Sequence, residues 1–321
     1  MQMQRKIKKA IFAGECMVEL SGKISSLGTS ETKMQVNIVG DTYNSAVYFA
    51  RLCAKSYVTH YFTAVGCDKF SEMMVKRFSN ENLNVSLIKK IKDKYPGLYS
   101  IHNDVKGNRS FSYWRSQSAA KLMLDDFMDD ERHKVFSNCD LFYYSGISAI
   151  ILEKRFEKKL IDIASKAKIT AFDFNYRKNL HTNIKTTQNL FKKINELVNI
   201  NFVSYDDILD IYGKTDPKEF VQNISRKNNI ILLRLHDHVV YSYYGEIGKV
   251  IVPIINAKDK TAAGDSFNAS FLANETIDKN MNIEEKILNA HELTRAVIKH
   301  DGAIIPQSKM PKQKRVANEN R

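Results

Sequence analysis

The sequence has no apolar run long enough to cross a membrane, no clustered cysteines and no internal repeat. Its first apolar stretch follows basic residues but is interrupted by Glu15 and Glu19, which argues against a secretory leader. The cysteines are widely spaced, form no CxxC motif and have no histidine cluster nearby. They are Cys16, Cys53, Cys67 and Cys139. We therefore expect reduced thiols, a cytoplasmic protein and no membrane partner.

Acidic residues are also scarce: 36 stand against 49 basic residues, a net charge of +13. Residues 1–10 carry +4 and residues 307–321 another +4, which leaves +5 on residues 11–306. Because the excess is concentrated at the two ends, we interpret each end as solvated and do not expect nucleic acid as a partner. Binding of nucleic acid through the basic ends stays open as an alternative.

Length and hydrophobic patterning predict an α/β fold. A chain of 321 residues, 43% of them hydrophobic, can bury a large core as one domain or two. Expected strands are 7–13, 58–65, 141–144, 169–174, 201–204, 230–235, 239–244 and 250–255. Expected helices are 41–52, 68–82, 153–166, 187–198, 207–212, 217–225, 266–275 and 283–299. Their alternation predicts a mostly parallel central sheet with helices on both faces, where ligands gather at the carboxyl ends of strands.

Two further segments predict a small separate sheet. Residues 98–101 and 110–114 alternate in hydrophobicity around Gly107-Asn108, which is typical of a hairpin. The polar segment 21–40 ends in a similar alternation at Met34, Val36 and Ile38. We expect these segments to form short strands away from the main core.

The stretch 258–269 carries the strongest chemical signal. Its small residues 262–264 let a backbone approach a ligand closely, and Asp265 before an apolar run predicts the first turn of a buried helix. Free amides at a helix start attract anions. A carboxylate held there can take a proton from an alcohol that attacks a phosphoryl group. On this pattern alone, an ordinary loop capping a core helix is the simpler interpretation.

This stretch resembles the second signature of the ribokinase-like (phosphofructokinase-B) sugar kinases, Asp-Thr-x-Gly-Ala-Gly-Asp-x-Phe. Lys260 replaces the usual threonine, Ala262 replaces the first glycine, and the spelling is most similar to the 2-keto-3-deoxygluconate kinase branch. Other segments follow in the order of that branch and cover nearly the whole chain. They are GECMVELS (14–21), GDTYNSAVYFAR (40–51), PGLYSI (96–101), SYWRSQSAAK (112–121), YYSGIS (143–148), FDFNYR (172–177) and GAIIP (302–306).

The resemblance implies a ribokinase-like kinase domain over residues 1–306, with a β lid from about residues 18–38 and 97–118, and a basic tail over 307–321. It implies ATP and Mg²⁺ as cofactors and a homodimer or higher homo-oligomer formed through the lid. The implied reaction is phosphorylation of 2-keto-3-deoxy-D-gluconate on its terminal hydroxyl, giving the 6-phosphate.

The resemblance also assigns residues on the acceptor side. Asp265 is the implied general base, with the amides of Ala262, Ala263 and Gly264 as the anion hole. The residues implied to contact the sugar acid are Gly40, Asp41, Asn44, Tyr99, Tyr113, Arg115, Arg177 and Asp301. The guanidinium of Arg115 suits a carboxylate, and Tyr113, two residues earlier on a strand, shares its face. Without the resemblance, this segment is a surface strand with a solvated arginine.

The nucleotide side departs from the family pattern. The residues implied to bind ATP are Asn175, Arg177, Ser204, Arg234 and Ala262 to Asp265. Where the family has a glycine-containing turn, this chain has Arg234-Leu235-His236-Asp237-His238-Val239, without either glycine. Asp207 stands where the family has a glutamate tied to Mg²⁺-bound water, so we expect it to hold such a water.

Two alternatives follow from these departures. The missing glycines favour a kinase-like protein that has lost catalysis and serves as a binding or assembly partner. The same chemistry on another sugar, such as ribose or fructose, is the other alternative. The pair Tyr113 and Arg115 argues against a neutral sugar.

Overall fold

The computed structural model describes residues 7–22, 34–103, 109–125, 131–136, 138–152, 154–181 and 183–312. Its main sheet has nine strands in the order β13-β12-β11-β10-β9-β8-β1-β4-β5. They are β1 (Lys8–Ala13), β4 (Tyr57–Val65), β5 (Ile88–Lys90), β8 (Leu141–Ser145), β9 (Ile169–Asp173), β10 (Ile200–Ser204), β11 (Ile230–Arg234), β12 (His238–Tyr243) and β13 (Glu246–Ile251). From β11 to β5 all neighbours are parallel, and β12 and β13 add an antiparallel edge.

Helices cover both faces of this sheet, and each face has its own hydrophobic core. One face carries α1 (Asp41–Cys53), α2 (Lys69–Asn80), α8 (Ala263–Ile277) and α9 (Ile283–Ile298). The other carries α3 (Gly146–Ile151), α4 (Lys154–Ala164), α5 (Ile184–Leu197), α6 (Tyr205–Tyr212) and α7 (Pro217–Ile224). Successive residues of β1 enter opposite cores, Phe12 the first and Ile11 the second, because side chains alternate along a strand. The expected α/β fold is confirmed.

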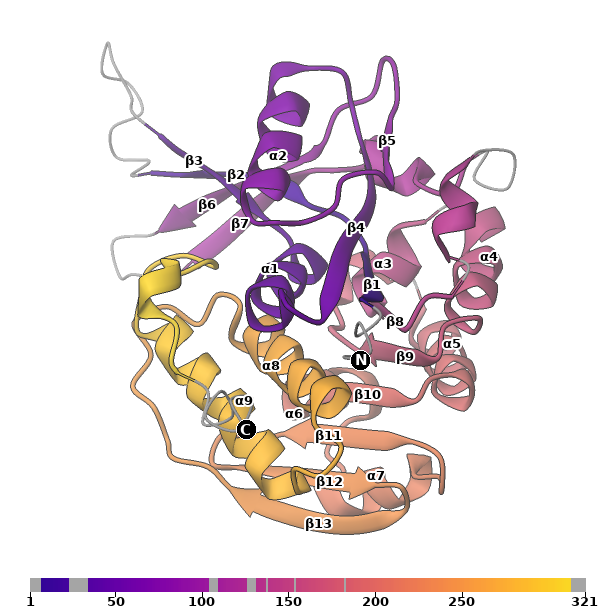
Figure 1. Cartoon of the computed structure of the whole chain (residues 1–321), viewed down its shortest axis with the longest axis vertical. Helices are drawn as coiled ribbons and strands as arrows, with labels where there is room; N and C mark the ends of the chain where they lie inside the picture. Colours follow the sequence, from indigo (N-terminus) through magenta and orange to yellow (C-terminus); the bar gives the residue numbers. More distant parts are fainter. Residues whose placement is uncertain are drawn as a thin grey trace, which may run out of the picture.

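A second sheet of four strands projects from the main sheet, at the upper left of Figure 1. This lid sheet has the order β3-β2-β6-β7 and consists of β2 (Met17–Ser21), β3 (Gln35–Val39), β6 (Gly97–Asn103) and β7 (Arg109–Trp114). The expected hairpin is the antiparallel pair β6 and β7, and β2 joins β6 in parallel. Of the segments assigned to the lid, 23–33 and 104–108 lie outside the described residues.

Most expected elements are present within a few residues of their predicted bounds, but the strand expected at 250–255 is wrong. The chain instead turns back after Tyr243 through Tyr244 (φ 53°) and Gly245 (φ 95°) and forms β13 at Glu246–Ile251. Two residues with positive φ make the tight hairpin turn that matches strand twist. Pro253 then follows outside the sheet, where its missing amide costs no ladder hydrogen bond.

The last described segment packs on α1. Tyr48 donates a hydrogen bond to the Ala303 carbonyl (2.7 Å), and Arg51 donates to the carbonyl of Ile305 (2.7 Å). The short 3₁₀ helices are Ala119–Leu122, Glu131–Phe136, Lys178–Leu180 and Gln307–Lys309. Residues 1–6 and 313–321, most of the basic ends, lie outside the described residues. Among the helices that the structure describes, none has the length and apolarity to span a bilayer.

Candidate active site

The loop that precedes α8 is fixed by Asp259. Its Oδ1 accepts hydrogen bonds from the amide (3.0 Å) and hydroxyl (2.7 Å) of Thr261, and its Oδ2 accepts from the amide of Gly302 (3.1 Å). Ala262 then caps the helix in the left-handed region, at φ 61°. The carboxylate therefore fixes both the loop before α8 and the one after α9.

The first turn of α8 offers backbone amides to an anion, although the set differs from the expected one. The Ala263 amide already donates to the carbonyl of Lys260 (3.2 Å). Helix geometry leaves the amides of Gly264 and Asp265 without an intrahelical acceptor. Gly264 thus retains a donor suited to an anion, and the Asp265 amide, which was not predicted, joins it. The expected contribution of the Ala262 amide stays a prediction.

The carboxylate of Asp265 lies where α8 meets α1. Its Oδ2 accepts a hydrogen bond from Asn44 Nδ2 (2.8 Å), and its backbone carbonyl accepts one from the Ser45 hydroxyl (3.2 Å). Burial raises the pKa of Asp265 well above its ordinary value, and the negative charge of Asp41 adds to this. Asn44 and the Arg177 charge act in the opposite direction. A carboxylate with a raised pKa is a stronger proton acceptor, as a general base requires.

Asp41 and Gly40 form the neighbouring wall. Asp41 Oδ2 accepts a hydrogen bond from Asn175 Nδ2 (2.6 Å), which links the start of α1 to the loop after β9. A Cβ at Gly40 would lie 2.5 Å from the backbone oxygen of Glu15, so only glycine allows this approach. The structure therefore links Asp41 to Asn175 and, through Asn44 of the same helix α1, places both near Asp265. The roles of Gly40, Asp41 and Asn175 in binding sugar or ATP stay predictions.

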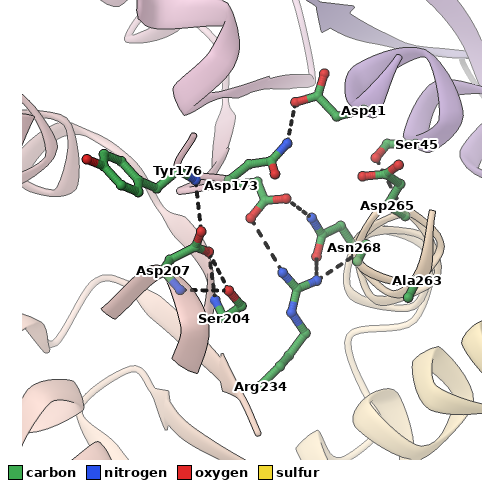
Figure 2. A network of polar contacts seen from close by, with 12 residues as sticks. Asp41, Ser45, Asp173, Tyr176, Ser204, Asp207, Arg234, Ala263, Asp265 and Asn268 are labelled. Atoms are coloured by element: carbon green, nitrogen blue, oxygen red, sulfur yellow. Dashed lines mark hydrogen bonds and ion pairs between the residues drawn. The ribbon is translucent and has the colours of Figure 1, made fainter. Parts of the chain in front are cut away.

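Arg234, expected to face the nucleotide, points largely back toward α8. Its Nη1 donates to the carbonyl of Gly264 (3.0 Å) and to Asn268 Oδ1 (2.7 Å), and its Nη2 lies 3.5 Å from Asp173 Oδ1 (Figure 2). Its guanidinium also lies over the Phe267 ring, 5.5 Å from the ring centre. Asp173 and Asn268, which the motifs did not assign, thus hold Arg234 against the start of α8.

Asp207 is engaged by its surroundings. Its Oδ2 accepts from the hydroxyl (2.7 Å) and amide (3.1 Å) of Ser204, and its Oδ1 accepts from the amide of Tyr176 (2.8 Å; Figure 2). The Ser204 hydroxyl in turn caps the start of α6, because it accepts a hydrogen bond from the Asp207 amide (3.1 Å). Both carboxylate oxygens are therefore used within the protein, and the expected role in holding a metal-bound water stays a prediction.

A cavity of about 600 Å³ lies between the β11–β12 turn and helices α8 and α9. Its lining residues are Ser204, Tyr205, Asp206, Arg234, Leu235, His236, Asp237, Val239, Val252, Pro253, Ile255, Ala257, Lys260, Ala263, Gly264, Phe267, His291, Thr294 and Ile298. The turn without glycines forms one wall and leaves the interior open. The volume is within the range of small-molecule sites.

The lid sheet presents aromatic and charged residues on the face that carries Tyr99. The Tyr99 and Tyr113 rings stack with centres 5.6 Å apart, and the Tyr99 hydroxyl donates a short hydrogen bond to Glu19. Arg115, expected to be available to a carboxylate, forms an ion pair with the buried Glu15. Sequence reasoning missed both glutamates, although GECMVELS contains them; two acids within an apolar strand pattern were the available signal.

The remaining two predicted residues differ in their surroundings. Arg177 is exposed and donates to the carbonyl of Tyr176 (2.8 Å), close enough to Asp265 for its charge to lower the pKa of that residue. Asp301 forms an exposed ion pair with Lys258 (2.5 Å). No hydrogen bond or ion pair within the described part of the chain joins Asp301 to Asp265 or to the lid sheet.

Comparison with known proteins identifies the family and the fold. The family model for "pfkB family carbohydrate kinase" matches residues 8–310. A 2-dehydro-3-deoxygluconokinase of Escherichia coli K12 is 34% identical over 319 residues, covering 95% of this chain and 99% of the relative. Two solved structures share the fold. A 2-dehydro-3-deoxygluconokinase from Thermotoga maritima has a TM-score of 0.79 at 17% identity and covers 93% of this chain and 96% of its own.

The second solved structure is a fructokinase with bound ATP from Xylella fastidiosa, with a TM-score of 0.74 at 17% identity, covering 94% of this chain and 95% of its own. The family match spans both sheets and every residue of the site described above. The chain therefore belongs to the pfkB family of carbohydrate kinases.

Proposed function

We propose that this kinase transfers the γ-phosphoryl group of ATP to the terminal hydroxyl of 2-keto-3-deoxy-D-gluconate, also called 2-dehydro-3-deoxygluconate. The relatives that carry this name support the substrate. The observation that carries the chemistry is the Asp265 carboxylate, held by Asn44 at the start of α8 between α1 and the cavity wall. A bond forms between the sugar O6 and the γ-phosphorus, the bond from that phosphorus to the bridging oxygen breaks, and ADP leaves.

The O6 proton passes to Asp265 as the new bond forms. Burial and the neighbouring charge of Asp41 favour the protonated carboxyl, so the transfer is less uphill than it would be to an exposed aspartate. The amides of Gly264 and Asp265, at the positive end of the α8 dipole, stabilise the charge that develops on the phosphoryl oxygens.

The residues around the cavity fit ATP. Val239, Val252 and Ile298 provide an apolar wall, and Lys260 adds a cation near the start of α8. Asp206 also lines the cavity, and its exposed carboxylate is better placed than Asp207 to hold a metal-bound water. A bound Mg²⁺ would neutralise charge on the ATP phosphates.

Replacing Asp265 by Asn tests the base. We expect kcat to fall by about 10²–10⁴-fold, because the amide cannot accept the proton, while sugar binding persists. Coupled measurement of ADP release gives kcat, and calorimetry gives the sugar dissociation constant. Asp278→Asn makes the same change at the other end of α8, where the side chain accepts from the Asn280 amide, and should leave kcat unchanged. Normal turnover in D265N would remove Asp265 from the mechanism.

The alternative of a kinase-like binding protein depends on the turn at residues 235–238, which lacks glycine. An ATP titration separates the two functions. The open cavity favours binding, and absence of binding at millimolar ATP would favour the non-catalytic role. A screen of sugars with and without a carboxylate distinguishes the proposed substrate from ribose or fructose.

A further inference from the structure

Glu15 lies where the main sheet passes into the lid sheet. It follows β1, precedes β2 and is only 3% exposed. Its Oε2 pairs with Arg115, the residue directly after β7. Its Oε1 lies against Gly97, the first residue of β6, where a Cβ would be only 2.7 Å away. One carboxylate therefore contacts the first residue of β6 and the residue that follows β7, and its own backbone leads into β2.

The ion pair with Glu15 neutralises much of the charge of Arg115. The Arg115 side chain is 11% exposed, and its described hydrogen bond goes to Glu15. Glu15 Oε1 and Arg115 Nε are buried, and the hydroxyl of Ser118 lies close enough to Glu15 to act with Arg115 in lowering its pKa. A buried polar atom left without a partner costs free energy, so the ion pair depends on such neighbours.

Asp41 acts on the same pair, and Glu19 is a second buried acid of the same segment. Asp41 at the start of α1 adds a negative charge that raises the pKa of Glu15, after the larger effect of burial. Glu19, on β2, faces Tyr99 and accepts from Asn37 Nδ2 (2.9 Å). A substrate carboxylate that approaches Arg115 therefore meets a cation that is already paired, beside further negative charge.

We propose that Glu15 is a positioning residue that holds Arg115 for the sugar acid and, by pairing with it, weakens the attraction of Arg115 for the substrate carboxylate. The inference rests on the proposed sugar-acid substrate. When one charge of an ion pair is removed, the remaining charge attracts a third charge a few ångströms away more strongly. The change is large enough to alter the dissociation constant of a charged ligand. Glu15 thus sets how strongly the pocket prefers an anionic sugar over a neutral one of the same shape.

The test compares 2-keto-3-deoxygluconate with its methyl ester, which keeps every hydroxyl and loses the charge. In Glu15→Gln the side chain keeps its size and an oxygen that accepts from Arg115. We expect the dissociation constant for the acid, measured by calorimetry, to fall by about three- to tenfold. The value for the ester should not change. Thermal unfolding of the variant confirms that it is folded.

A double-variant cycle separates a role through Arg115 from a general change of the pocket. In an Arg115→Gln background, E15Q should leave unchanged the ratio of the dissociation constants for the acid and the ester. Glu19→Gln alters another buried carboxylate of the same segment, one that accepts a hydrogen bond from Tyr99, and should affect acid and ester alike.

Three outcomes contradict the role of Glu15. The ratio of the dissociation constants for acid and ester is unchanged in E15Q, the dissociation constant for the acid rises, or E15Q has an equal effect in both backgrounds. If wild-type enzyme phosphorylates the acid while the ratio is unaltered in E15Q, only this inference fails. If wild-type enzyme binds and phosphorylates no sugar acid, the proposed substrate fails, and the role of Glu15 fails with it.

Discussion

Asp173 ends β9 beneath the start of α8, where it is 2% exposed. Its Oδ2 accepts from Asn268 Nδ2 (2.8 Å), and Arg234 lies at 3.5 Å from its Oδ1. Burial raises the pKa of Asp173 from 3.8 to about 7, and the charge of Arg234 offsets only part of this rise. Asp173 therefore positions Arg234 and Asn268, but burying its carboxylate lowers the stability of the folded protein.

That cost gives a pH-dependent prediction. Between about pH 4 and 7, folded Asp173 holds a proton that the unfolded chain releases, so its contribution to stability falls as pH rises and is constant above the folded pKa. Asn at this position does not titrate. The stability of Asp173→Asn relative to wild type should therefore rise with pH in this window, by at most about 1.4 kcal/mol per pH unit.

Urea unfolding at pH 5 and pH 8 measures this difference. Comparing the variant with wild type at each pH cancels the opposite contribution of buried histidines such as His60, whose pKa is lowered to about 4. The same stability difference at both pH values would mean that the pair with Arg234 keeps Asp173 ionised.

At the scale of elements, the start of α8 carries a conformational strain. Ala262 has a φ of 61°, a region that disfavours residues with a Cβ, whereas the signature it resembles has glycine there. We expect Ala262→Gly to stabilise the protein by about 0.5–1 kcal/mol, the relief of strain being partly offset by the greater freedom of the unfolded chain. Ala263→Gly, one residue later within the helix, should instead destabilise by about 0.5–1 kcal/mol. Guanidinium unfolding of both variants provides the measurement, and equal effects would contradict the strain.

Much of the element order could be predicted because strand and helix periods are local properties. The exceptions depend on tertiary contacts. In α1, residues 42–50 are all buried, polar ones included, because the helix lies between the sheet and α8. The β12–β13 hairpin was missed because Tyr244 is an unusual residue for a turn with positive φ.

The site was predictable to the same extent. Asp265 and Asn44 belong to local motifs, and the structure joins them. The pairing of Glu15 with Arg115 links residues a hundred positions apart through the register of the lid sheet, which local patterns do not encode. The inward orientation of Arg234 likewise depends on Asp173, on another strand.

At the scale of the whole molecule, the lid sheet has an apolar hollow of about 450 Å³ bordered by Val18, Leu98 and Trp114. Trp114 is 60% exposed and the adjoining Tyr95 is 65% exposed. Exposed aromatic residues around a hollow are typical of protein interfaces. We therefore keep the prediction of a homodimer formed through the lid sheet.

Light scattering tests this prediction. Wild-type protein should have the mass of a dimer or a higher homo-oligomer, and Trp114→Glu should shift it toward monomer because a charge would be buried in the interface. Ile251→Glu places the same charge on an equally exposed residue of β13, at the far edge of the main sheet, and should leave the mass unchanged. A monomeric wild type would end the proposal.

The four strands of the lid sheet come from two separate stretches of chain, β2 with β3 and β6 with β7, and α1, β4, α2 and β5 lie between them in the sequence. A chimaera that borrows this sheet from another kinase therefore needs junctions on both sides of each stretch. Two of those junctions fall beside Glu15 and Arg115, which must come from the same parent if their pair is to form. Exchanging Glu15 and Arg115 together keeps their ion pair and requires no junction within the lid sheet.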